Sequence, residues 1–359
     1  MDEQKVSDSK KWWLWGIVFV VLIIVGFLIF KKPLEAEPIK IGYIGPLTGE
    51  NAVIGEGIKN AISLSGKNKN VQIIYEDDQF NTKLGVTAYH KLRDIDKVDA
   101  IINTTPSVID AITPLLNENP IVVIQIAEPE LSTDDSIFQI MPSGATLYDE
   151  LGKIAKNKYS SFAFVYQNGA TFEKAKNFFK KSYEDSLHQF QEYRLDNSKD
   201  YKTLIAKIKN DNIEAYTIIA TPSVGVQFIK QLNEQQVGSI LLCNADMEVT
   251  IGEYLKVLPD EIFNGCVSTM FASRMSDIFK TEYKNTFKIE PGFASDYGYD
   301  AISILIKTHS LNLETQINSL KDLEFNGVSG KISFNSQGVR IPEIEEHVFK
   351  NGLFVKIED

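Results

Sequence analysis

Short apolar runs alternate with amphipathic stretches along most of this chain. The runs have the length and the β-branched or aromatic character of strands, and the stretches between them place apolar residues three and four positions apart, as helices do. Such alternation is typical of parallel sheets covered by helices. The runs form two sets of four, which predicts two doubly wound parallel-sheet lobes of the α/β class. The first set begins near Ile39, Val71, Val98 and Ile121, and the second near Ser161, His188, Ala215 and Gly238.

The last part of the chain departs from this alternation. A strand-like run at 265–271 leads to a helical stretch at 296–308 and to a further strand at 330–335. Asn351-Gly352 then separates two alternating runs, which predicts a β-hairpin. The first two helices of the alternating part are expected to bury Ile54, Ile58, Ala61 and Ile62 in one case, and Leu84, Ala88, Leu92 and Ile95 in the other.

The N-terminal region carries a long uncharged segment. Residues Trp12–Phe30 form a run of 19 residues without charge, with lysine pairs on both sides. A helix of this length spans about 28 Å, close to the thickness of the bilayer hydrocarbon. A cleaved signal peptide is the alternative, but the flanking sequence offers no small-x-small cleavage site. We therefore predict an uncleaved transmembrane anchor at 12–30, followed by a linker at 31–38.

Composition limits the possible partners and the redox state. The chain has 359 residues, 43% of them hydrophobic and 24% charged, which is the balance of a globular protein. Its net charge of −11, without a basic cluster in the lobes, argues against a nucleic-acid partner. Cys243 and Cys266 are the two cysteines. Two buried thiols are the expected state, and a disulfide between them is the alternative.

No catalytic or metal-binding constellation can be assembled from the sequence. The four histidines are scattered without ligand spacing, and neither a G-x-S-x-G elbow nor a P-loop occurs. Gly55-Glu-Gly57 does not complete a dinucleotide fingerprint. Glu76-Asp77-Asp78 could in principle bind a cation, but we expect a solvated segment at a helix start. The sequence thus predicts a protein that is not an enzyme and that has no metal and no cofactor.

Candidate ligand contacts follow the predicted strands, because open parallel sheets bind ligands beyond the carboxyl ends of their strands. These positions are rich in hydroxyl and amide groups. Thr-Pro-Ser-Val occurs after the third strand of each set, at 105–108 and at 221–224, either to approach one ligand from two sides or simply to cap the next helix. The candidate contacts are Thr48, Thr105, Ser107, Gln125, Ile126 and Ala127 in the first set, and Tyr166, Asn168, Thr171, Thr221 and Asp246 in the second.

Several segments resemble the leucine/isoleucine/valine-binding protein family, the solute receptors of ABC transporters. They are IKIGYIGPLTGENAVIGEGIKNAI, VQIIYEDDQ, KVDAIIN, FQIMPS, YGYDAISIL and GVSGKISFNSQG, and they cover about residues 39 to 359 in order. The resemblance implies a type I periplasmic-binding-protein fold whose two lobes are joined by three crossovers, near 138–143, 268–273 and 326–331. Lobe 1 would comprise 39–140 and 273–326, and lobe 2 would comprise 141–272 and 327–359.

The resemblance also implies a function and a location. The lobes would close on a small polar or amino acid-like ligand, for delivery to an ABC permease or, alternatively, for sensing or assembly without transport. They would lie outside the cell membrane on a single-pass anchor, with residues 1–11 in the cytoplasm. The family's hydroxyl contact falls on Thr105 or Ser107, and its acidic contact, which holds an ammonium group, on Asp246. The family's Ala-Thr pair is Ile126-Ala127 here, and its aromatic positions fall near Ile54, Thr171 and Thr221.

Overall fold

The first parallel sheet follows the strand pattern of the sequence. The computed structural model describes residues 16–20, 37–127, 134–196, 200–272, 275–310 and 312–358. All neighbouring strands of this sheet run parallel, in the order β2-β1-β3-β4-β5. The five strands are β1 (Ile39–Gly45), β2 (Val71–Asp77), β3 (Ala100–Asn103), β4 (Val122–Gln125) and β5 (Ile137–Gln139).

Helices cover both faces of this sheet, as the burial of its central strands requires. One face packs against α2 (Ala52–Gly66) and α11 (Ser295–Thr308), and the other against α3 (Thr82–His90) and α4 (Pro106–Glu118). The second predicted helix differs from its expected pattern. It continues as a π-helical turn, Lys91–Ile95, and this turn leaves Ile95 exposed while Leu92 stays buried. Leu84 is also exposed.

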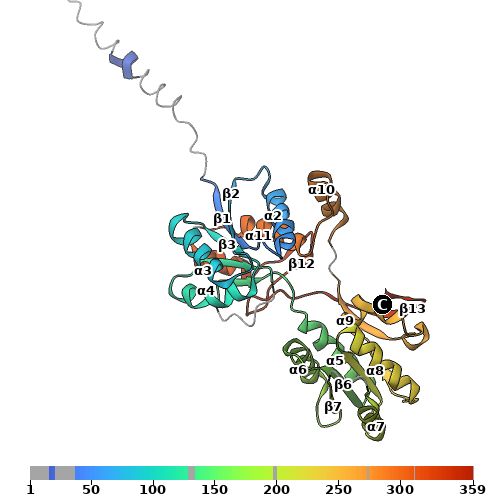
Figure 1. Cartoon of the computed structure of the whole chain (residues 1–359). Helices are drawn as coiled ribbons and strands as arrows, with labels where there is room; N and C mark the ends of the chain where they lie inside the picture. The colour runs from blue at the N-terminus through green and yellow to red at the C-terminus, as the bar shows by residue number, and fades with distance from the viewer. Residues whose placement is uncertain are drawn as a thin grey trace, which may run out of the picture.

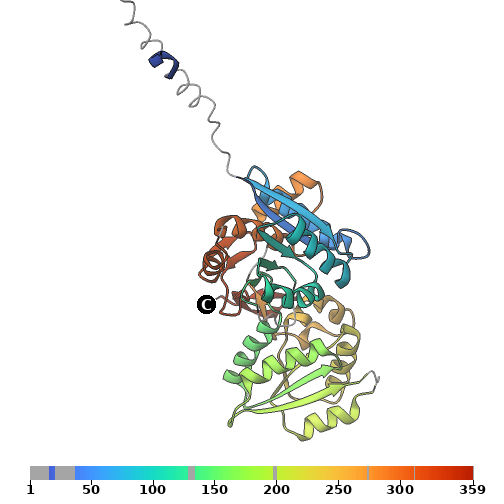
Figure 2. The same cartoon turned by 90° about the vertical axis from the view of Figure 1, so that its left-hand side faces the viewer.

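The second lobe repeats the parallel arrangement. Its sheet has the order β7-β6-β8-β9, from strands β6 (Ser161–Gln167), β7 (Gln189–Leu195), β8 (Ala215–Ile219) and β9 (Ile240–Leu241). Figures 1 and 2 show this green-to-gold lobe below the blue-and-orange first lobe. Its helices are α5 (Ala145–Lys158), α6 (Ala170–Tyr183), α7 (Lys202–Asn210), α8 (Pro222–Glu234) and α9 (Ala245–Leu255).

The C-terminal part of the chain completes both lobes. The antiparallel sheet β10-β13-β14 belongs to the second lobe, with β10 at Val267–Phe271, β13 at Ile344–Lys350 and β14 at Leu353–Lys356. The predicted hairpin is confirmed, with Asn351 and Gly352 at the positive φ angles of 51° and 84° that a tight turn between strands requires. The first lobe gains α10 (Asp277–Phe287), α12 (Leu313–Lys321) and the short hairpin of β11 (Phe325–Gly327) and β12 (Gly330–Ile332).

The third crossover lies later in the chain than predicted. Ile332 and Phe334 belong to the core of the first lobe, and the Phe334 ring lies 5.2 Å from that of Phe138. The chain therefore crosses to the second lobe after Arg340, at 341–343, and the boundary predicted near 326–331 is wrong. The short strands of this hairpin carry too little pattern to show which core they join.

One buried arginine fastens two of the crossovers to the first lobe. Arg340 stands just before the third crossover and is 2% exposed. Its guanidinium donates to the carbonyl of Ile140, just before the first crossover, at 3.4 Å. It also donates to the Ser329 hydroxyl at 2.9 Å, and to the carbonyls of Ser329 and Lys331 at 2.8 and 2.7 Å. The planar guanidinium has several N–H donors in fixed directions, so it can reach all of these acceptors at once, which a lysine ammonium group could not do as well.

The turn at Val328–Ser329, which accepts hydrogen bonds from Arg340, also donates hydrogen bonds to a carboxylate. Asp300 in α11 accepts the backbone N–H groups of Val328 and Ser329 at 2.9 and 2.8 Å. The Val328 carbonyl in turn accepts the N–H of Ser276, which ends the second crossover, at 2.9 Å. All three crossovers thus meet one turn of the first lobe.

The predicted transmembrane anchor lies largely outside the described residues. Of 12–30, only residues 16–20 are described, and they form an exposed helical segment. Within the described parts of the chain, no helix has both the length and the apolar character needed to cross a membrane.

Candidate functional site

The loop after β1 is shaped by one carboxylate. Asp77, at the end of β2, accepts the backbone N–H groups of Leu47, Thr48 and Gln79 at 2.8, 3.2 and 3.0 Å, and also the Thr48 hydroxyl. Burial opposes ionisation of Asp77, but these hydrogen bonds outweigh it and lower the pKa. Thr48 is exposed, as a ligand contact must be, but its hydroxyl hydrogen is committed to Asp77.

The next carboxylate is not the solvated group that we expected. Asp78 is fully buried, and burial raises its pKa. Its Oδ1 accepts the N–H of Phe80 at 2.8 Å. Among the neighbouring side chains, Thr105 does most to lower the pKa against the effect of burial. Among the described residues, no group of three or more acidic, histidine or cysteine side chains is arranged to hold a metal ion.

Two predicted contacts of the first lobe lie beneath the site surface rather than on it. Thr105 and Gln125 are fully buried. The Asn103 side-chain amide donates to Gln125 Oε1 at 2.7 Å and to the Thr105 carbonyl at 2.9 Å, which ties the ends of β3 and β4 together. Ser107 is exposed and accepts the Thr82 hydroxyl at 2.7 Å. Of the two alternatives for the family's hydroxyl contact, Ser107 is the one at the surface.

An apolar cavity opens at the strand ends of the first lobe. Its volume is about 40 Å³, and Ile126 and Ala127 belong to its wall. Phe80 and Phe293 also line it, although they are 48% and 62% exposed. Sequence reasoning missed both phenylalanines, because it favoured loop residues with hydroxyl or amide groups, and phenylalanine has neither. The lining comprises Pro46, Asn51, Ile54, Ile58, Phe80, Thr104, Ile126, Ala127, Met141, Phe293 and Ala294.

Asp246 of the second lobe lies beside α5, the helix that follows the first crossover. This residue lies in the first turn of α9, which starts near the crossovers (Figure 1). Asp246 is exposed, and the Tyr148 hydroxyl donates to its Oδ2. Burial, followed by the charge of Asp246, raises the pKa of Tyr148 well above its usual range, so the hydroxyl keeps its proton. Asn244 caps the helix by accepting the Met247 N–H at 3.0 Å.

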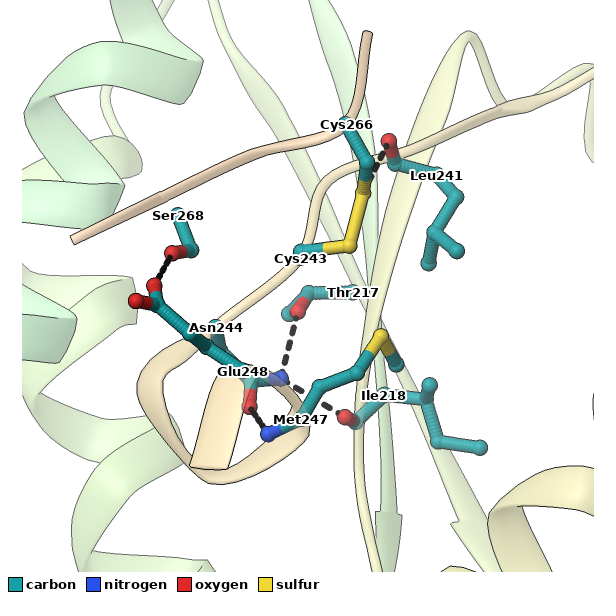
Figure 3. Close-up of a disulfide and its surroundings, with 9 residues drawn as sticks. All are labelled: Thr217, Ile218, Leu241, Cys243, Asn244, Met247, Glu248, Cys266 and Ser268. Carbon is teal, nitrogen blue, oxygen red and sulfur yellow. Dashed lines mark hydrogen bonds between the residues drawn. A yellow bond between two sulfur atoms is a disulfide. The ribbon is translucent and has the colours of Figure 1, made fainter. Parts of the chain in front are cut away.

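A disulfide fixes the start of α9, so our expectation of two free thiols is wrong. Cys243 and Cys266 are bonded across 23 positions of sequence (Figure 3). Cys243 directly precedes the helix cap, and Cys266 directly precedes β10. One turn into α9, Glu248 accepts the Ser268 hydroxyl and lies 2.7 Å from Nδ1 of His347. The helix that carries Asp246 is therefore attached to both β10 and β13.

The remaining predicted contacts of the second lobe separate into core and surface. Tyr166 is 2% exposed and belongs to the hydrophobic core, with its hydroxyl accepting from Arg194 at 3.3 Å. Asn168, Thr171 and Thr221 are exposed.

The repeated Thr-Pro-Ser-Val turns do not cap their helices with side chains. Thr105 and Thr221 both occupy the cap position, with proline following, but neither side chain makes a cap hydrogen bond. Thr221 instead donates its N–H and its hydroxyl to Gln167 Oε1 at 3.0 and 3.1 Å. Thr105 is buried and Thr221 is exposed, so the first turn reaches the surface through Ser107 and the second through its threonine.

Comparison with known proteins identifies the architecture. A family model described as "Periplasmic binding protein" matches residues 38–342. A putative branched-chain amino acid ABC transporter protein from Rhodospirillum rubrum has a TM-score of 0.74 and 17% identity, over 89% of this chain and 100% of that one. These findings confirm the predicted resemblance and a type I periplasmic-binding fold with two parallel-sheet lobes.

Two similar structures contain ligands of different chemistry. The branched-chain amino acid substrate-binding protein of Streptococcus pneumoniae, in complex with isoleucine, has a TM-score of 0.57 and 15% identity, over 89% of this chain and 100% of that one. A solute-binding protein from R. palustris, in complex with benzoate, has a TM-score of 0.57 and 16% identity, over 89% and 95%. At such identities the likeness establishes the fold and leaves the ligand open.

Proposed function

Because the chain belongs to the periplasmic binding protein family, whose members bind solutes and are not enzymes, we propose that it is the solute receptor of an ABC-type uptake system. It holds a small polar or amino acid-like molecule between its lobes and transfers it to a permease. The observation that carries this proposal is the pairing of an apolar cavity in the first lobe with an exposed carboxylate, Asp246, in the second. The cavity has room for one end of a small molecule, and the facing lobe would enclose the rest.

The position of the lobes outside the cell membrane is part of the same proposal. The uncharged run at 12–30 serves as a single-pass anchor, with 1–11 in the cytoplasm. The disulfide between Cys243 and Cys266 supports this arrangement, because structural disulfides persist in oxidising compartments. Protease added to intact cells that carry a C-terminal epitope on this protein is expected to remove the epitope. Protection of the epitope until the cells are lysed would refute the orientation.

Ligand binding is tested by a thermal-shift screen of the full chain, purified in detergent. The panel contains amino acids, amines, small organic acids, sugars and nucleosides. A ligand at about 100 times its Kd stabilises a single-site protein by about 2.7 kcal/mol. For a lobe of this size, each kcal/mol raises Tm by about 2–4 °C, so a true ligand gives a clear shift. A folded protein that responds to no compound would overturn the receptor proposal and favour an assembly role.

Transport is separated from sensing by uptake. Cells that lack the protein are expected to lose uptake of the radiolabelled ligand found in the screen, and the wild-type gene is expected to restore it. A variant that folds but does not bind provides the control, and Asp246→Asn is suited to it because it keeps the shape of the side chain. Unchanged uptake in the deletion strain, together with tight binding in vitro, would favour the sensing role.

A further inference from the structure

The chemistry of the two walls of the proposed site restricts the ligand further. Resting on the proposed function, we propose that the ligand is an apolar amine: a protonated amino group on an aliphatic or aromatic body, with no carboxylate beside it. Three features carry this inference: an uncharged apolar wall in the first lobe, the lack of an uncommitted hydroxyl among the described residues that line it, and a carboxylate in the second lobe that has no cationic partner among the described residues.

The wall of the first lobe suits a hydrocarbon body. None of the described residues that line its cavity carries a charge. Ile54, Phe80 and Phe293 are exposed there although water contact with large apolar side chains is unfavourable. An aliphatic or aromatic ligand group would cover these three side chains and gain the free energy of removing both surfaces from water.

The same wall offers little to a carboxylate. Thr104 is the one described residue of the cavity lining that has a hydroxyl, and this hydroxyl donates to the Ile44 carbonyl at 3.2 Å. The exposed Ser107 does not belong to the lining, the Thr48 hydroxyl donates to Asp77, and the Thr105 side chain is buried beside Asp78. Ile126 and Ala127 have no hydroxyl. A carboxylate at these strand ends would approach two protein carboxylates, and like charges at short distance repel.

The second lobe offers a cation site. Asp246 is exposed at the start of α9 and receives one hydrogen bond, from Tyr148. Within the described residues, no lysine, arginine or histidine forms an ion pair with it. An ammonium group would donate charge-assisted hydrogen bonds to this carboxylate, and such bonds are stronger than those between neutral groups. The net charge of −11 adds a long-range attraction for cations.

Matched compounds test the ligand class by calorimetry on the full chain in detergent. 3-Methylbutylamine, leucine and 4-methylpentanoate share a branched aliphatic body and differ in whether they carry the amine, both groups or the acid. Phenethylamine, phenylalanine and 3-phenylpropanoate form the aromatic set. In at least one set, the amine is expected to bind at least tenfold more tightly than the amino acid, and the acid is expected not to bind. An amino acid that binds as tightly as its amine, or an acid that binds, overturns the inference.

This test separates the inference from the proposed function. If the six compounds fail while the broad screen finds a ligand that is not an apolar amine, the amine class is wrong and the receptor function stands. If the broad screen is silent as well, both are wrong.

Two variants of α9 test the role of Asp246. Asp246→Asn is expected to weaken binding of the amine at least tenfold and to strengthen binding of the matched acid, a reversal that general damage to the fold would not produce. Glu253→Gln is the control, because it removes an exposed carboxylate from the same helix, one that is paired with Lys256 at 2.6 Å. It is expected to leave both affinities unchanged. Equal amine affinity in Asp246→Asn and the wild type overturns the assignment.

Discussion

Replacing both Cys243 and Cys266 with serine is expected to destabilise the second lobe strongly. The bond joins residues 23 apart, and a cross-link over this distance raises the free energy of the unfolded chain by about 3.5 kcal/mol through loop entropy. Both residues are buried, at 0% and 4% exposure, so the serine hydroxyls add a cost of their own. At about 2–4 °C per kcal/mol, Tm of this lobe should fall by about 7–14 °C.

Scanning calorimetry with and without reductant measures this effect. A reducing agent should lower Tm of the wild type towards that of the double serine variant and should leave the variant unchanged. Because Cys243 precedes the cap of α9, the variant should also bind its ligand more weakly at a temperature where it is still folded. The reasoning is refuted if the variant melts within about 2 °C of the wild type, or if the reductant lowers both proteins equally.

Burial raises the pKa of Asp296 from 3.8 to about 6. The folded state therefore binds the proton of this carboxyl group more tightly than the unfolded chain does. As a result, the free energy of unfolding falls as the pH rises from about 4 to about 6. Asp296→Asn should therefore raise the free energy of unfolding by up to about 3 kcal/mol at pH 7.5 and by little at pH 4 in urea titrations; an equal gain at both pH values would contradict this origin. Gly55→Ala should unfold at lower urea concentration than the wild type, because its Cβ would lie 1.9 Å from the carbonyl oxygen of Pro46. Gly252→Ala, in the open middle of α9, should instead stabilise the protein by about 0.5–1 kcal/mol, and a loss of stability there would count against helix propensity as the deciding effect.

The sheets could be predicted from the sequence because their signal is local and repeated. Most of the buried strands are short and largely apolar runs, and an amphipathic helix follows most of them. The Asn351-Gly352 hairpin was equally readable, since few residue pairs adopt two successive positive φ angles.

The site could be predicted only in part, because side-chain direction at a strand end depends on neighbours that are distant in sequence. Gln125 points beneath the surface because it is paired with Asn103 across β3 and β4. Thr105 follows β3, and its carbonyl accepts the Asn103 side-chain amide at the same buried place. Tyr166 joins the core for a similar reason, as α5 and α6 cover its side of the sheet. The exposed phenylalanines at the cavity could not be assigned at all.

The disulfide and the third crossover were missed because both depend on which segments become neighbours in space. Cys243 follows the shortest strand of the second sheet, and nothing near it in sequence indicates that Cys266 lies alongside. The segment after β12 is short and weakly patterned, and only the packing of Phe334 against Phe138 shows that it belongs to the first lobe.

The turn at Val328–Ser329 has a mechanical consequence for any movement of one lobe against the other. Because Arg340 and Asp300 hold this turn, and because Ile140 and Ser276 are bonded to the same assembly, the first lobe retains one end of every connection. Rotation must then be absorbed on the second-lobe side of these bonds, which for the first and third connections means residues 141–144 and 341–343. A change in the angle between the lobes would therefore leave the hydrogen bonds around Val328–Ser329 intact and alter the backbone only beyond them.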